Sequence, residues 1–324
     1  FIKVIGINFA IFGILLVSPS IIYRIYSEFK PKFVQLTNQT VDKRAYYPTY
    51  ANNQFSIELL NEFDKLPSNY RSFIGWRREK VNFKYTNVLS PYNVRKSKGQ
   101  SVDNSVWFFG GSTMWGTGTT DLQTIPSHFF DLSNTPVYNF GESGWTSRQS
   151  LNQLINAIGE DHKPSAVIFY DGVNDVINQC RSEVKLVPSH SREIRIQNAL
   201  NQPIERISNF ILSPYIAIAS KFRIQFPGVN RSQSKLYDCD INKEKARLVA
   251  QHLVNNWRTA YSLSKSNNFK FYGVLQPTLF STETNSEYLK ENLVKMYPEY
   301  KRQYNAVYPL ILEEISRHCG LDKD

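Results

Sequence analysis

Four runs of apolar residues recur along the chain after residue 100, and each one is followed by glycine or by a polar residue. The runs cover residues 106–109, 136–140, 166–170 and 269–275. Uninterrupted apolar runs of this length are typical of strands that are buried on both faces of a sheet. The pattern therefore predicts four buried β-strands.

Longer stretches with a helical spacing of apolar residues lie between these runs. They cover residues 122–132, 147–158, 192–225 and 242–265. Strands that alternate with helices favour a parallel sheet with helices on both faces, which is a three-layer α/β/α sandwich. The segment 177–245 is long for a simple crossover, so we expect a mainly helical insertion that shapes one rim of the sheet.

The first part of the chain has a different character. Residues 4–22 carry no charge, and a helix of that length just spans a hydrocarbon layer of roughly 30 Å. We predict an uncleaved transmembrane anchor over residues 1–22, with a cleaved signal peptide or a buried core helix as the alternatives. Residues 23–100 are polar and aromatic; we interpret them as a membrane-proximal segment that packs on the main domain, residues 101–324, and contains a short helix near 55–64.

Composition and charge exclude several classes of protein. Hydrophobic residues make up 41% of the 324 residues, with 15 Gly and 15 Pro, which rules out a disordered or collagen-like chain. The net charge of +10 suits a domain near a membrane or one that meets acidic polymers. Because the chain has no basic helix and no Arg/aromatic repeat, we expect no nucleic-acid partner.

The cysteines do not suggest a metal site. The chain has three of them, none with zinc-binding spacing, and we expect neither a metal ion nor a cofactor. Cys180 and Cys239 flank the predicted insertion, where they either form a disulfide or remain free thiols.

Small and polar residues follow three of the predicted strands. Ser112 follows the first in Gly-Gly-Ser-Thr, Gly144 follows the second in Asn-Phe-Gly-Glu-Ser-Gly, and Asn174 follows the third in Asp-Gly-Val-Asn-Asp. Open parallel sheets bind ligands beyond the carboxyl ends of their strands, so these residues are candidates for one site. Taken singly, each has an ordinary explanation as a helix cap, a turn glycine or an Asx-turn.

Taken together, these segments resemble three of the four sequence blocks of the SGNH (GDSL-like) hydrolase family, and in particular its membrane-anchored bacterial members. The resemblance covers residues 101–280, with Gly111 standing where Asp is common in the first block. It implies a flavodoxin-like parallel sheet and Ser112 as the nucleophile. It also implies an oxyanion hole formed by the Ser112 N–H, the Gly144 N–H and the Asn174 side chain, which stabilises the charge that develops on the carbonyl oxygen.

The family's fourth block, an Asp-x-x-His that supplies the general base, has no counterpart in the chain. None of the five histidines has an aspartate three residues before it; they are His128, His162, His190, His252 and His318. A serine hydroxyl needs a base to take its proton. We therefore expect a fifth strand and this motif beyond residue 324, so that the main domain is C-terminally truncated and its catalytic set is incomplete.

These inferences predict a membrane-anchored serine esterase with its catalytic domain outside the cytoplasm, in the periplasm or at the cell surface. We expect it to form an acyl-enzyme and to remove acyl groups, chiefly acetyl, from a carbohydrate or envelope polymer, so that its partner is a small-molecule or polysaccharide ester. An O-acyltransferase with the same residues, or a non-catalytic glycan-binding scaffold, is the alternative. We also expect Trp115, which follows Ser112 closely, to contact the substrate.

Overall fold

The computed structural model describes residues 2–37, 42–50, 52–185, 187–201, 211, 236–281 and 297–318. The chain divides into two compact units. One contains residues 1–41 and 194–234, and the other contains residues 42–193 and 235–324. The second unit holds both sheets of the described residues.

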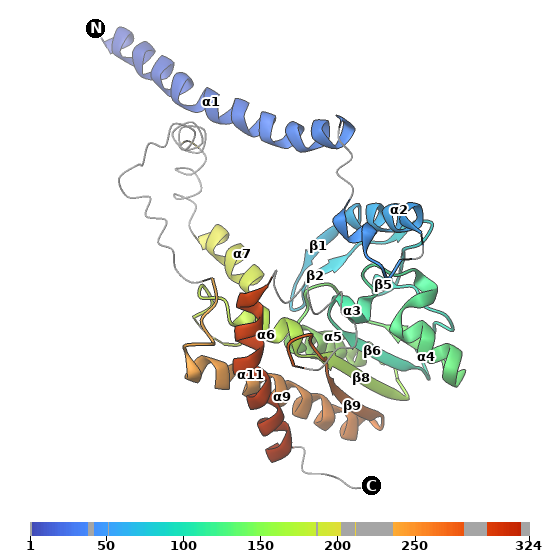
Figure 1. Cartoon of the computed structure of the whole chain (residues 1–324). Helices are drawn as coiled ribbons and strands as arrows, with labels where there is room; N and C mark the ends of the chain where they lie inside the picture. Colours follow the sequence, from blue (N-terminus) through green and yellow to red (C-terminus); the bar gives the residue numbers. More distant parts are fainter. Residues whose placement is uncertain are drawn as a thin grey trace. The chain divides into compact units, whose positions relative to one another are not determined.

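Six strands follow one another between residues 68 and 110, and from there on strands and helices alternate (Figure 1). The strands are β1 (Ser68–Arg71), β2 (Gly75–Arg78), β3 (Val81–Asn82), β4 (Asn87–Leu89), β5 (Val94–Arg95), β6 (Val106–Gly110), β7 (Val137–Asn139), β8 (Ala166–Asp171) and β9 (Lys270–Leu275). The α-helices are α1 (Ile2–Thr37), α2 (Asn53–Asp64), α3 (Ser112–Trp115), α4 (Ile125–Ser133), α5 (Ser147–Gly159), α6 (Val173–Gln179), α7 (Ser191–Asn201), α9 (Lys243–Asn267) and α11 (Pro298–His318). Two 3-10 helices, η1 (Lys43–Tyr46) and η2 (Asp121–Gln123), complete the set.

Seven strands form one mixed sheet in the order β3-β4-β5-β7-β6-β8-β9. Strands β7, β6, β8 and β9 are parallel, which confirms the predicted parallel sheet. Strands β3, β4 and β5 extend one edge in antiparallel orientation. Residues 81–95, which we had assigned to a segment packing on the domain, are thus part of its sheet. Strands of two or three residues are too short to leave a periodic pattern in the sequence.

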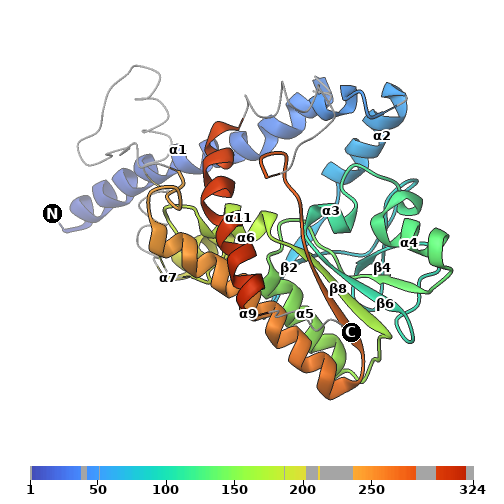
Figure 2. The same ribbon diagram turned by 60° about the horizontal axis from the view of Figure 1, so that its bottom comes forward.

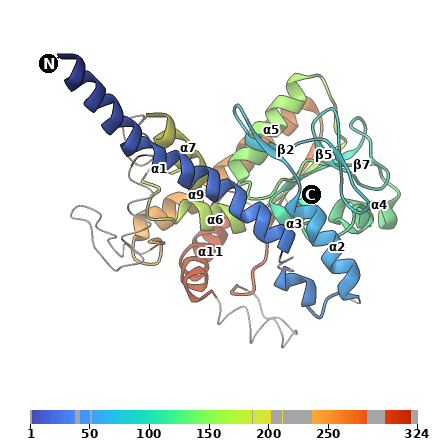
Figure 3. The same cartoon turned by 90° about the horizontal axis from the view of Figure 1, so that it is seen from above.

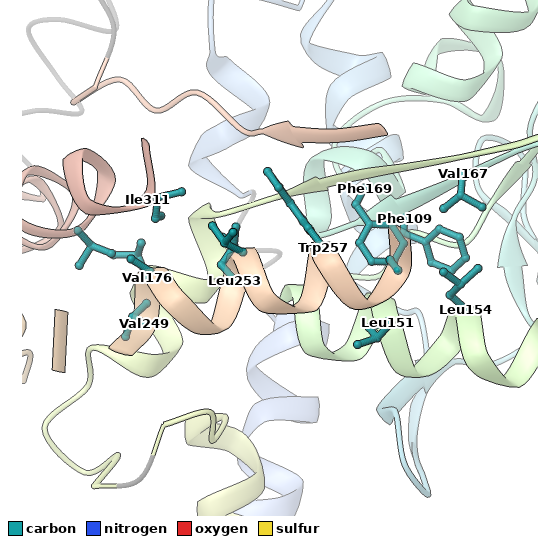
Figure 4. Close-up of a cluster of buried hydrophobic side chains, with 14 of the residues drawn as sticks. Phe109, Leu151, Leu154, Val167, Phe169, Val176, Val249, Leu253, Trp257 and Ile311 are labelled. Carbon is teal, nitrogen blue, oxygen red and sulfur yellow. The ribbon is translucent and has the colours of Figure 1, made fainter. Parts of the chain in front are cut away.

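Alternate residues of β6 enter two layers of core. Trp107 and Phe109 belong to the large cluster on the side of α5 and α9, whereas Val106 and Phe108 belong to the cluster that α4 covers. Figures 2 and 3 show these helices on opposite faces of the sheet. In the close-up of the larger cluster, Phe109 and Phe169 lie against side chains of α5 and α9 (Figure 4). Each such burial contributes about 1.5–3 kcal/mol, so both layers stabilise the predicted α/β/α sandwich.

Strand β9 differs from the expectation that it is buried on both faces. Gly273 faces Trp257 of α9, so closely that a Cβ at 273 would lie 2.6 Å from the indole ring. On the other face, Tyr272 and Val274 are 50% and 41% exposed. Among the described elements no strand pairs with the outer edge of β9. The apolar run therefore marks a strand that is covered on one face only.

The predicted helices agree with the structure wherever the structure describes their residues. The helices predicted at 122–132, 147–158 and 242–265 correspond to α4, α5 and α9, and the short helix predicted near 55–64 corresponds to α2. The prediction over 192–225 begins within α7, but most of it lies outside the described residues.

The N-terminal helix is longer than the apolar stretch that predicted it. Helix α1 ends at Thr37, and its segment Gly6–Tyr23 has a mean hydropathy of 1.8 with 6% of the segment buried. By length and composition α1 can cross a membrane. Its low burial does not fit the alternative of a core helix, and both a membrane anchor and a signal sequence pass the same test.

Cys180 and Cys239 form a disulfide, which decides between the two states left open by the sequence. Both residues are buried, and they stand 59 residues apart in the chain. The disulfide joins the end of α6 to the segment before α9 and so closes the insertion at its base.

Two buried aspartates lie beneath the carboxyl end of β8. Burial raises the pKa of the Asp175 carboxyl, and hydrogen bonds from the Ser147 N–H, the Ser147 hydroxyl and the Gly172 N–H act in the opposite direction. Within the residues that the structure describes, Asp171 accepts from the Ser150 hydroxyl and the Trp257 indole, at 3.2 and 3.3 Å. Burial, followed by the negative charge of Asp175, raises the pKa of the Asp171 carboxyl well above its ordinary value.

The raised pKa of Asp171 predicts a pH-dependent stability. The folded state favours the protonated Asp171 carboxyl. The stability that this preference contributes is complete below the ordinary carboxyl pKa, about 4, and is lost as pH rises through the raised pKa. Within that window the folded state should lose up to about 1.4 kcal/mol per pH unit. Asp171→Asn, which cannot ionise, should gain stability relative to the unmodified chain as pH rises. Urea unfolding at several pH values measures the difference, and a difference that stays constant with pH contradicts the assignment.

Candidate active site

The loops that follow β6, β7 and β8 meet at one rim of the sheet because these strands are parallel neighbours. Ser112 is the first residue of α3, directly after β6. Gly144 lies in the loop between β7 and α5, and Asn174 lies in the first turn of α6, after β8. All three residues are partly exposed, so a ligand can reach them.

The side chain of Asn174 joins the three loops. Its Nδ2 donates a hydrogen bond of 2.8 Å to the Trp145 carbonyl, which follows Gly144 directly. The same Nδ2 lies over the backbone of Gly111, where an added Cβ would come within 2.3 Å of it. Glycine at position 111 is thus a consequence of the close approach of Asn174. An amide NH₂ group has two hydrogens, and the contact with Trp145 uses one of them.

The loop after β7 is also fixed to α3 by a buried amide. Asn139 Nδ2 donates to the Met114 carbonyl, and Asn139 Oδ1 accepts from the Gly141 N–H, both at 3.0 Å. The Glu142 N–H donates to the Gly110 carbonyl across the same gap. These bonds hold the loop containing Gly144 beside the turn that contains Ser112.

Hydrogen-bonding capacity at this rim is left unused. In the part of the chain that the structure describes, the Ser112 hydroxyl has no hydrogen-bond partner, and neither the Ser112 N–H nor the Gly144 N–H has an acceptor. The Ser112 carbonyl, in contrast, accepts from both Gly116 and Thr117, which fixes the turn. The rim therefore presents a hydroxyl together with backbone and amide donors that can bind a developing negative charge.

Gly144 adopts a backbone conformation that other residues rarely take. Its φ angle is +82°, in the left-handed region, and its Cα faces the Trp76 ring. His190 contacts its carbonyl, with 3.1 Å between Nε2 and the Gly144 oxygen. Because His190 Nδ1 accepts from the Arg192 N–H, the ring proton belongs on Nε2 and is donated to Gly144. With both nitrogens in use, His190 holds the loop and does not accept a proton from Ser112.

None of the histidines, all five of which fall in the described residues, hydrogen-bonds to Ser112. His162 pairs with Asp103 at the amino-terminal end of β8, whereas the candidate site lies at the carboxyl ends of the strands. His318 pairs with Glu314 at the end of α11. His128 lies on α4 and His252 on α9.

The structure corrects one expectation for this region and adds residues that the sequence did not reveal. Trp115 is fully buried, with its ring against Phe63 and under the Arg95 guanidinium, so it cannot contact a substrate. Gln276 was not predicted at the rim; its Nε2 donates to Thr113 Oγ1 at 2.8 Å. Its position directly after an apolar run was the one available signal. For Trp76 the sequence predicts packing on the domain, with a place in a sugar-binding cleft as the alternative, and for His190 it offers a role as a possible base.

A serine hydroxyl among unused donors at the carboxyl edge of a parallel sheet is the arrangement expected of an α/β hydrolase. The family model for the GDSL-like lipase/acylhydrolase matches residues 106–318, well over half of the chain. The chain therefore belongs to the GDSL-like lipase/acylhydrolase family, and it is an ester-hydrolysing enzyme.

Solved structures that match the chain have low sequence identity to it. LAE5, an alpha/beta hydrolase enzyme from the metagenome of Lake Arreo in Spain, is 13% identical, with a TM-score of 0.31 over 68% of this chain and 76% of that chain. A putative lipolytic protein of the G-D-S-L family from Desulfitobacterium hafniense DCB-2 is 16% identical, with a TM-score of 0.27 over 62% and 98%. A mutant of the esterase AlinE4 is 16% identical, with a TM-score of 0.25 over 62% and 95%. Because these TM-scores are low, we assign no residue of the site from these structures. No curated protein sequence matches the chain.

The contact between Asn174 and Gly111 can be tested by adding a methyl group. Gly111 has a φ angle of −82°, which alanine adopts freely, so Gly111→Ala should fold. The new Cβ has to displace the Asn174 amide, and we expect esterase turnover to fall by about 10²-fold. Gly159→Ala is the matched control, because a Cβ there meets nothing within 4 Å. Steady-state kinetics of both variants provide the measurement. A Gly111→Ala enzyme with unchanged kcat/KM rules out the proposed placement of Asn174.

Proposed function

We propose that the protein is a serine esterase that works through an acyl-enzyme on Ser112, with the Ser112 N–H, the Gly144 N–H and the Asn174 amide as its oxyanion hole. The observation that carries this proposal is the position of Asn174 Nδ2, which contacts the backbones of both other loops and keeps one hydrogen unused. The three donors come from three separate loops that meet at the rim where the partly exposed Ser112 lies.

The reaction follows from this arrangement. The Ser112 oxygen attacks the ester carbonyl carbon, and a base takes the hydroxyl proton. The carbonyl oxygen becomes an oxyanion, which the three donors stabilise, and the tetrahedral intermediate then expels the alcohol after the base returns the proton. Water attacks the acyl-enzyme by the same steps and releases the acid and free Ser112.

We propose that the base is a histidine outside residues 1–324. This is supported by the five histidines of the chain, whose contacts place none of them against Ser112. It is also supported by an open groove of about 480 Å³ between the end of β9 and α11, lined by residues that include Leu275, Gln276 and Tyr308. Gln276 contacts Thr113, so a segment in this groove would lie close to Ser112.

We propose an extracytoplasmic location and an acylated polymer as the substrate. Helix α1 supports attachment to a membrane, and the disulfide between Cys180 and Cys239 supports an oxidising compartment. The net charge of +10 favours contact with an acidic polymer. An ester on an envelope or extracellular carbohydrate, chiefly an acetyl ester, fits these three features together.

Release of acetate from an acetylated envelope polysaccharide tests the assignment in the full-length enzyme. Ser112→Ala should release none and should not react with a fluorophosphonate, because it has no nucleophile. Asn174→Ala should lower kcat by about 10²–10³ with little change in KM, since it removes one oxyanion donor. Undiminished acetate release by Ser112→Ala contradicts the proposed nucleophile. Transfer of the acetyl group to an added glycan, in place of release into water, identifies an O-acyltransferase.

The proposed position of the base has its own test. Residues 1–324 alone should hydrolyse an activated aryl acetate far more slowly than a longer natural chain that supplies the histidine, because nothing takes the Ser112 proton. Added imidazole should restore part of that loss by acting as an external base. Equal rates for the two chains would show that the base lies within residues 1–324.

A further inference from the structure

The hairpin of β1 and β2, outside the segment matched by the family model, contacts the loop that contains Gly144. Trp76 of β2 hydrogen-bonds to both neighbours of Gly144. Its Nε1 donates to the Ser143 carbonyl at 2.9 Å, and its own carbonyl accepts from the Trp145 indole at 3.0 Å. Both tryptophans are buried. The residues before and after Gly144 are thus fixed by one side chain and its backbone.

Gly144 itself is contacted on two sides. A Cβ at this position would lie 3.3 Å from Trp76 Cζ2, so the indole ring covers the Cα. His190 donates to the carbonyl, and its ring packs edge-on against the Trp76 ring with centroids 4.7 Å apart. The Gly144 N–H belongs to the Ser143–Gly144 peptide plane, which Trp76 holds through the Ser143 carbonyl. The plane after Gly144 is held by His190 at its carbonyl and by the Trp145 N–H, which donates to the Glu142 carbonyl. Together these contacts set the direction of the N–H at a glycine, whose backbone is otherwise the least restricted.

The next two residues of β2 continue the attachment. Arg77 Nη1 donates to the Phe140 carbonyl at 2.8 Å, and the guanidinium lies 4.8 Å from the Trp145 ring. The Arg78 N–H donates to the carboxylate of Glu142, a fully buried residue that also accepts from the Ser143 N–H. Three consecutive residues of β2 therefore hold the loop from its start to its end.

The hairpin has a rigid support of its own. Gln149 Nε2 and Asn152 Nδ2 on α5 donate to the carbonyls of Ile74 and Phe73, in the turn of the hairpin. Since α5 packs directly on the central sheet, β2 is fixed to the same layer that positions the strands. The hairpin therefore holds the loop that contains Gly144 in a fixed position relative to the sheet.

We propose that Trp76 and His190 are positioning residues of the esterase, which aim the Gly144 N–H at the oxygen that becomes negative in the transition state. This inference rests on the proposed role of Gly144 in the oxyanion hole. Neither residue touches the substrate. Trp76 fixes the Ser143–Gly144 peptide group, which carries this N–H, and His190 fixes the Gly144–Trp145 peptide group next to it. Small errors in the placement of a catalytic group can cost about 10²-fold in rate.

Kinetics of Trp76 and His190 variants in the full-length enzyme test this inference. Trp76→Phe keeps an aromatic ring but loses the donor to Ser143, and His190→Ala loses the donor to Gly144. Each should lower kcat by about 10- to 100-fold with KM nearly unchanged, and should slow inactivation by a fluorophosphonate by a similar factor. His190→Gln should recover most of the loss, because its amide nitrogen can reach the place of Nε2 and donate to the same carbonyl.

Trp107→Phe is the matched control. It removes a hydrogen bond of 2.6 Å from a buried indole to the Val102 carbonyl, at the end of β6 that lies away from Ser112. It should cost stability but leave kcat unchanged. If Ser112→Ala is inactive while Trp76→Phe and His190→Ala lose no more turnover than Trp107→Phe, the inference is overturned and the proposed function stands. If Ser112→Ala remains active, the proposed function fails and this inference fails with it. Should Trp76→Phe not fold, the comparison of His190→Ala with His190→Gln decides.

Discussion

The contact of the Asn174 amide with two backbones is the interaction on which the rest of the site depends. Its hydrogen bond to the Trp145 carbonyl and its position over Gly111 set the spacing of three loops that are far apart in the sequence. A side chain larger than hydrogen at position 111 would separate them. Because the amide has a second hydrogen, the group that assembles the site can also serve the reaction in it.

The sheet and its buried polar groups make this contact reproducible. Parallel pairing places the ends of β6, β7 and β8 at one rim, and Asp175 then ties the start of α5 to the turn after β8 through Ser147 and Gly172. On the other side of the Gly144 loop, β2 and His190 hold the backbone. The groups proposed to react with the substrate are thus partly exposed, whereas the side chains that fix their positions are buried.

Strand and helix positions in the main domain could be predicted from the sequence because its apolar runs alternate with helical patterns. The three blocks around Ser112, Gly144 and Asn174 could be found because each follows a strand. The antiparallel strands β3, β4 and β5 could not, since two or three residues show no periodicity. The contact of Trp76 with the loop that contains Gly144 could not be predicted either, because Trp76 donates to a backbone carbonyl, which leaves no signature in the partner sequence. Trp115 was misjudged because closeness to Ser112 in the chain does not determine the direction of a side chain on a short helix.

A structure of the full-length enzyme with a phosphonate bound to its nucleophile tests the central claim most directly, since the phosphonyl oxygen occupies the place of the oxyanion. Our account predicts a covalent bond to Ser112 Oγ, with this oxygen about 2.7–3.2 Å from the Ser112 N–H nitrogen, the Gly144 nitrogen and Asn174 Nδ2. A phosphonate attached to another residue, or an oxygen that points into solvent with Asn174 turned away, would contradict it.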